Sequence, residues 1–100
     1  EVIKAGAREG ERLWELPADE SFSKHFKSEV ADIKNVGGAA GGATIGAMII
    51  GMFAEDTPWV HLDIAAVSRT NSINGDDPKG ATGTPVKTLV ALCQSISEDR

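Results

Sequence analysis

Cysteine, aromatic residues and long apolar runs are all scarce in this 100-residue sequence. The single cysteine, Cys93, excludes an internal disulfide and fits a reducing compartment, so the cytoplasm is the expected location. Apolar runs such as Ala47–Ile50 are far too short to cross a bilayer, and the N-terminus lacks the charged-then-apolar pattern of a signal peptide. We therefore expect no membrane partner.

Positive charge is also in short supply, because ten basic residues face fifteen acidic ones and leave a net charge of −5. Nucleic acids and anionic membranes both require a positive patch, so neither is expected as a partner. The apolar fraction of 41% is typical of a folded globular chain of about one domain. The first residue is Glu1 and not Met, from which we expect a processed product or a piece of a longer protein.

What the sequence does contain is helical periodicity. Phe22, Phe26, Val30 and Ile33 recur at steps of three and four residues, the spacing of one helix face. The same spacing recurs elsewhere, and Thr84 before a proline is a suitable cap for the last helix. The pattern predicts helices over about 2–15, 19–34, 43–54 and 84–97.

One segment, "PWVHLDIAAV", predicts a β-strand over about 59–67, because it is rich in β-branched and aliphatic residues. Both of its faces are largely apolar, which indicates an interior strand, yet no partner strand is visible in the sequence. The fold class is therefore α/β, and we expect the chain to be part of a larger α/β domain. Pairing with another copy of itself is the alternative. A polar loop follows over 68–83, with turn signals at Asn74-Gly75 and Asp77-Pro78.

Two groups of residues could carry chemistry. His61 and Asp63 lie two residues apart and would share one face of a strand, but no third metal ligand is indicated. We interpret them as a hydrogen-bonded structural pair, with a small metal-binding protein using His25, His61 and Asp63 as the alternative. The glycine-rich loop "NVGGAAGGA" has alanine, Ala43, where a phosphate-binding loop needs lysine. We interpret this loop as a site of close backbone packing, and we assign no catalytic residue and no metal ligand.

Four blocks in chain order resemble one family: "GERLWELP", "SEVADIKNVGG", "GATIGAMIIGMFAEDTPWVHLDIA" and "PKGATGTPVKTLV". Together they are similar to the C-terminal portion of a leucine aminopeptidase, of the cytosol aminopeptidase family. The resemblance implies a fragment of a three-layer zinc-exopeptidase-like domain. Residues 1–100 would form the C-terminal part of a single α/β catalytic domain, with the missing strands in the upstream part of the same enzyme. It also implies assembly as a homohexamer.

The resemblance further implies an enzyme that releases N-terminal amino acids from peptides with two divalent metal ions, zinc or manganese. The family's ligand motif, "NTDAEGR", does not occur in this sequence, so we expect this chain to bind no metal and to be inactive alone. Ala65 and Ser68 match positions that line the family's substrate pocket. Ser68 stands where the family often has a larger apolar residue, which leaves the preferred substrate side chain open. The alternative function is a stand-alone assembly module without catalysis.

Overall fold

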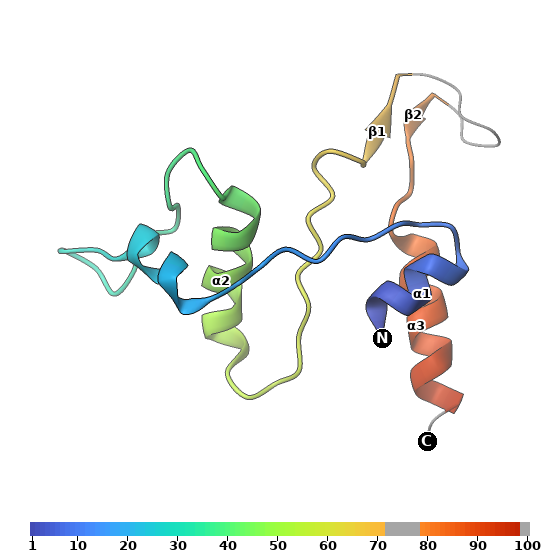
Figure 1. Cartoon of the computed structure of the whole chain (residues 1–100), viewed down its shortest axis with the longest axis horizontal. Helices are drawn as coiled ribbons and strands as arrows, with labels where there is room; N and C mark the ends of the chain where they lie inside the picture. The colour runs from blue at the N-terminus through green and yellow to red at the C-terminus, as the bar shows by residue number, and fades with distance from the viewer. Residues whose placement is uncertain (72–78, 99–100) are drawn as a thin grey trace. The chain divides into compact units, whose positions relative to one another are not determined.

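The structure of the chain is a computed structural model, which describes residues 1–71 and 79–98. Its elements follow in the order α1 (Val2–Arg8), the 3-10 helix η1 (Glu20–Phe26), α2 (Gly42–Ala54), β1 (Arg69–Thr70), β2 (Gly80–Ala81) and α3 (Val86–Glu98) (Figure 1). They form two compact units. The terminal unit consists of Glu1–Glu15 and the chain from Ile64 onward, and the central unit is Leu16–Asp63. No helix among the described residues has the length and apolar character needed to cross a membrane.

In the terminal unit, α1 packs against α3 (Figure 1). The residues between these helices are small: Ala5 is 3% exposed and Ala91 is 7% exposed. α3 confirms the predicted helix over 84–97, with its ends within two residues of the expected ones. The side of α3 that carries Leu89 and Val90 stays exposed, so only one face of this helix is buried in the described structure.

The prediction of a first helix over 2–15 is wrong, because α1 ends at Arg8. Gly10 adopts a left-handed conformation with φ of 73°. The Glu11 amide then donates to the Gly6 carbonyl at 2.9 Å, and the Gly10 amide donates to the Ala7 carbonyl at 3.4 Å. This pair of bonds is the Schellman pattern, which satisfies the last carbonyls of a helix and turns the chain away.

The central unit packs η1 against α2 around two buried side chains, Phe26 at 5% and Ile45 at 2% exposure. α2 confirms the predicted helix over 43–54. It begins directly after Gly41, which has a left-handed conformation with φ of 70°. This conformation suits a residue without a Cβ atom and explains one glycine of the glycine-rich loop.

The predicted helix over 19–34 is wrong in type and length, because η1 ends at Phe26 and Lys27 is extended. The Ser28 hydroxyl accepts hydrogen bonds from the amides of Val30 and Ala31, at 3.2 and 3.1 Å. Such local bonds compete with helical ones and favour a turn. Val30, expected on the buried face, is 97% exposed.

The prediction of a strand over 59–67 is also wrong. The described residues there form no strand, and 65–67 form a turn. A strand requires a hydrogen-bonded neighbouring strand, and within residues 1–71 and 79–98 no strand pairs with this segment. The sheet of the described residues is instead the two-residue antiparallel ladder of β1 and β2, which pairs Arg69 with Ala81 and Thr70 with Gly80. The turn signals at Asn74-Gly75 and Asp77-Pro78 lie outside the described residues.

Candidate functional site

The two predicted pocket residues lie on one turn, Ile64–Ser68, which we call the 64–68 turn. The Ile64 carbonyl accepts hydrogen bonds from the amides of Val67, at 3.0 Å, and Ser68, at 2.9 Å. Ala65 is exposed on this turn and Ser68 is half-buried at its end. The structure therefore places Ala65 and Ser68 on the same turn, together with the larger side chains of Ile64 and Val67.

Thr82, in the segment that precedes α3, makes two hydrogen bonds to the 64–68 turn. The Thr82 hydroxyl donates to the Val67 carbonyl at 2.6 Å, and the Thr82 amide donates to the Ser68 carbonyl at 3.0 Å. The amide of Thr84 in turn donates to the Thr82 hydroxyl at 3.3 Å. Sequence reasoning did not single out Thr82. Its only signal was its place in the block "PKGATGTPVKTLV".

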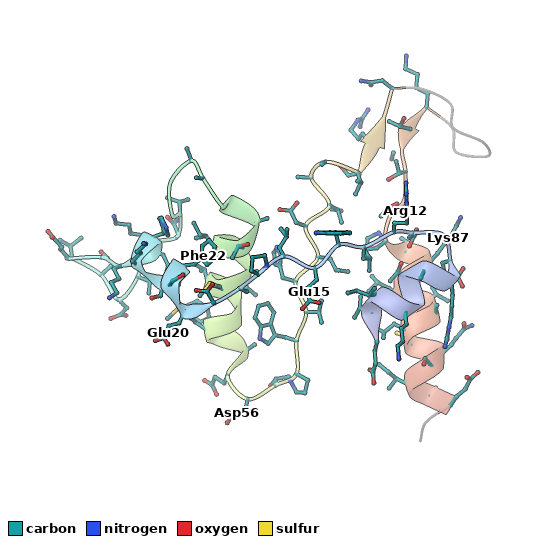
Figure 2. The ribbon with its side chains drawn as sticks, viewed as in Figure 1. Arg12, Glu15, Glu20, Phe22, Asp56 and Lys87 are labelled. Carbon is teal, nitrogen blue, oxygen red and sulfur yellow. The ribbon has the colours of Figure 1, made fainter. Side chains whose placement is uncertain are left out.

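The start of α3 is capped by a side chain from far away in the sequence. A carboxylate oxygen of Glu11 accepts hydrogen bonds from the Thr88 amide at 2.8 Å and from the Thr88 hydroxyl at 2.6 Å. Thr88 is fully buried, at 0% exposure, and follows Lys87 in the first turn of the helix (Figure 2). A carboxylate at this position satisfies free helix donors and interacts favourably with the helix dipole. The sequence predicted Thr84 for this role and missed Glu11.

Gly6 determines how closely the Glu11 backbone approaches α1. A Cβ atom on Gly6 would lie 2.5 Å from the Glu11 carbonyl oxygen and 3.0 Å from a methyl carbon of Leu13. Backbone atoms cannot yield as a flexible side chain can, so this approach requires glycine. Gly6 and the Glu11 carboxylate together fix the beginning of α3. The segment just before this helix carries Thr82, which bonds to the 64–68 turn.

The residues considered as metal ligands do not form a metal site. Within residues 1–71 and 79–98, no group of three or more His, Cys, Asp and Glu side chains lies close enough together to hold a metal ion. His61 and Asp63 are both exposed, and Cys93 is exposed on α3. The ring of Phe22, labelled in Figure 2, has its centroid 6.3 Å from that of the His25 ring. The donor set of the described residues does not fit a two-metal centre.

Electrostatics single out one carboxylate, and it lies outside the candidate site. Hydrogen bonds from the side chain and the amide of Ser21 lower the pKa of Asp19 below its ordinary value of 3.8. The hydrogen bond from the Ser21 amide to the Asp19 carboxylate is 2.8 Å long, and Asp19 is the N-cap of η1. Because these bonds stabilise the charged carboxylate at the start of a helix, the shift belongs to capping and not to catalysis.

Comparison with known proteins decides what kind of chain carries this turn. Residues 1–90 match the family model described as the cytosol aminopeptidase family, catalytic domain. The chain belongs to the cytosol aminopeptidase family. It is 47% identical over 91 residues to a probable cytosol aminopeptidase of Solibacter usitatus, covering 91% of this chain and 19% of that protein. It is 40% identical over 98 residues to a probable cytosol aminopeptidase of Alkaliphilus metalliredigens, covering 98% of this chain and 20% of that protein.

The fold shows the same relationship. A solved structure of a mutant tomato leucine aminopeptidase superposes with a TM-score of 0.77 and 40% sequence identity, over 90% of this chain and 17% of that one. This member of the cytosol aminopeptidase family therefore shares its fold with a portion of a leucine aminopeptidase. The chain spans about a fifth of the length of the curated relatives it matches.

Proposed function

We propose that residues 1–100 form the C-terminal part of a single α/β catalytic domain, of three layers, in a metal-dependent aminopeptidase. The enzyme releases N-terminal amino acids from peptides in the cytoplasm and assembles as a homohexamer. The observation that carries the proposal is the family match over residues 1–90, supported by the fold likeness to a leucine aminopeptidase. Two divalent ions, zinc or manganese, supply the Lewis-acid chemistry of the whole enzyme.

The contribution of this chain is one wall of the substrate pocket, made by Ala65 and Ser68. Small side chains leave room for the first side chain of the peptide, and the Ser68 hydroxyl makes that wall more polar than an aliphatic residue would. Changes of this size in a pocket alter discrimination between substrates by roughly 1–3 kcal/mol. We therefore expect the side-chain preference of the enzyme to depend on residues 65 and 68.

The metal ligands belong to the part of the enzyme outside this chain. The described residues bring together no group of three ligand side chains, and the motif "NTDAEGR" is absent from the full sequence. The proposal therefore predicts that the chain alone is inactive. In the isolated chain, Val86, Leu89 and Val90 of α3 are 60%, 45% and 52% exposed, and the remainder of the catalytic domain covers them in the whole enzyme.

A direct comparison of the whole enzyme with residues 1–100 tests the proposal. Hydrolysis of leucine p-nitroanilide and bound zinc and manganese are measured for both proteins. We expect turnover and bound metal in the full-length enzyme and neither in the isolated chain. Turnover with stoichiometric metal in the isolated chain would contradict the proposed division of labour, and a full-length protein that cleaves no N-terminal residue would exclude the aminopeptidase activity.

The stand-alone assembly module is the second candidate, and the exposed apolar residues of α3 are the observation that favours it. If they pair between copies, light scattering of the isolated chain will give one monodisperse oligomer. If they are the uncovered surface of a severed domain, the chain will aggregate over a broad size range. In that case, adding the remaining part of the enzyme will suppress the aggregation.

A further inference from the structure

We infer that Thr82 is a positioning residue that fixes the 64–68 turn and thereby sets which N-terminal side chains the substrate pocket prefers. This inference rests on the proposed function, because it concerns the pocket wall of the same enzyme. It adds a residue that does not itself contact the substrate and acts through Val67 and Ser68.

The hydrogen bonds of Thr82 determine where its hydroxyl proton points. A hydroxyl has one proton to donate and lone pairs to accept. The Thr84 amide can only donate and the Val67 carbonyl can only accept, so the Thr82 proton is directed at Val67. The hydroxyl thus links the backbone just before α3 to the turn in a fixed direction.

The turn requires such a link because apolar packing does little to hold it. Residues 65–67 are exposed, and the side chain of Val67 is 49% exposed. The Ile64 carbonyl holds the amides of Val67 and Ser68, and Thr82 holds the carbonyls of the same two residues. The three peptide groups from Ala66 to Arg69 are therefore all hydrogen-bonded, and the bond to the Val67 carbonyl comes from a side chain.

The two bonds from Thr82 respond differently to mutation. Replacing the hydroxyl removes the bond to Val67 and keeps the amide bond to Ser68, because the latter comes from the backbone. The Ser68 carbonyl then keeps its bond from Thr82, whereas the Val67 carbonyl loses its bond and gains freedom. We expect a displaced pocket wall and not an unfolded segment, so the consequence is a change in substrate preference.

The experiment uses Thr82→Val in the full-length enzyme, because valine has nearly the shape of threonine without the hydroxyl. The value of kcat/KM is measured for the p-nitroanilides of leucine, methionine and alanine. The quantity of interest is the ratio of kcat/KM between leucine and alanine. Partial unfolding lowers both values by the same factor and leaves this ratio unchanged, so a merely structural role would not move it.

We expect Thr82→Val to change the leucine-to-alanine ratio about fivefold, the scale of one neutral hydrogen bond. Thr82→Ser keeps the hydroxyl and should restore the wild-type ratio. Thr57→Val is the matched control, since Thr57 is exposed in the central unit and does not belong to the 64–68 turn. Its ratio should equal that of the wild type.

An active wild-type enzyme with an unchanged ratio in Thr82→Val would overturn the inference and leave the proposed function standing. A shifted ratio in Thr82→Ser would also overturn it, because the hydroxyl would then not be the group responsible. A wild-type enzyme without activity would reject the proposed function itself. If Thr82→Val does not fold, Thr82→Cys replaces it, because a thiol is a weaker donor. The Cys variant should then give a smaller shift in the leucine-to-alanine ratio, and an unchanged ratio would count against Thr82.

Discussion

The contacts inside the terminal unit differ in kind from the contacts inside the central unit. In the terminal unit, hydrogen bonds from or to side chains join distant segments: Thr88 donates to Glu11, and Thr82 donates to Val67. Among its described residues, the buried apolar side chains are the small ones of Ala5 and Ala91. In the central unit the buried apolar side chains are large, Phe26 and Ile45, and the elements that carry them are neighbours in sequence. The buried Thr44 adds one hydrogen bond, from its hydroxyl to the Pro17 carbonyl.

The close approaches at glycine differ in the same way. A Cβ atom on Gly6 in the terminal unit would meet the Glu11 backbone oxygen at 2.5 Å. A Cβ atom on Gly37 in the central unit would meet two side-chain carbons of Ile45, at 2.6 and 2.7 Å. Hydrogen bonds are directional and apolar contacts are not. The unit that carries the proposed pocket wall is thus the one whose contacts fix orientation, whereas the central unit is stabilised by burial.

The largest expected effect comes from Ile45→Ala. This change removes most of the side chain of Ile45, which is the buried apolar residue of α2. Large-to-small changes at buried sites cost roughly 2–5 kcal/mol. Hydrogen exchange with mass spectrometry on the 100-residue chain reads α2 and α3 separately, and we expect α2 to lose protection while α3 keeps it. Ile50→Ala makes the same chemical change at a residue that is 56% exposed and should have little effect. Equal loss of protection in α3 would contradict the expectation that Ile45 stabilises only the central unit.

Glu11→Ala is the corresponding change in the terminal unit. It leaves the amide and hydroxyl of a fully buried Thr88 without their acceptor, which costs about 1–3 kcal/mol. Hydrogen exchange should then rise in the first turn of α3 and not in α2. Glu9→Ala is the matched control, because Glu9 is an exposed glutamate two residues earlier. If the Glu9 variant opens α3 as much as the Glu11 variant does, the cap is not what holds this helix.

Ser68→Leu tests whether the terminal unit carries the pocket wall, and its effect is on substrate preference in the full-length enzyme. The larger apolar side chain should reduce the room for long N-terminal residues and lower the leucine-to-alanine ratio of kcat/KM about tenfold. Ser97→Leu introduces the same side chain at an exposed position near the end of α3 and should leave the ratio unchanged. Identical ratios for the two variants would remove Ser68 from the pocket.

The same division between near and distant contacts explains what the sequence could predict. The predictions of α2 and α3 were close to the observed bounds. Each helix has 13 residues, and apolar residues recur along it at steps of three and four, which is a signal that a short window of sequence contains. The Glu11 cap on Thr88 spans 77 positions in the sequence, and no local pattern marks it. The Thr82 bond to Val67 was missed for the same reason. Ala65 and Ser68 came from the family resemblance, and their place in the pocket stays a prediction.

The first two predicted helices were too long for local reasons, and the helix-like composition and spacing around them hid these reasons. Gly10 ends α1 through its left-handed conformation, although the helix-forming residues around it favoured continuation. Ser28 turns the chain after η1, although Val30 and Ile33 continued the apolar spacing. The strand over 59–67 failed for a non-local reason, because the composition of a strand does not supply its neighbours.

The smallest expected effect is the acid sensitivity of η1 in the central unit. The side chain and amide of Ser21 lower the pKa of Asp19 below 3.8, so the folded turn favours the charged carboxylate. Stabilisation of η1 by Asp19 is therefore complete above pH 3.8, the ordinary value, and is lost as the pH falls through the lower folded value. The amide chemical shift of Ser21, followed by NMR in the 100-residue chain, should titrate with a midpoint below 3.8. This step should vanish in Asp19→Asn. A midpoint at the ordinary value would mean that this cap does not form and that Asp19 does not stabilise the central unit.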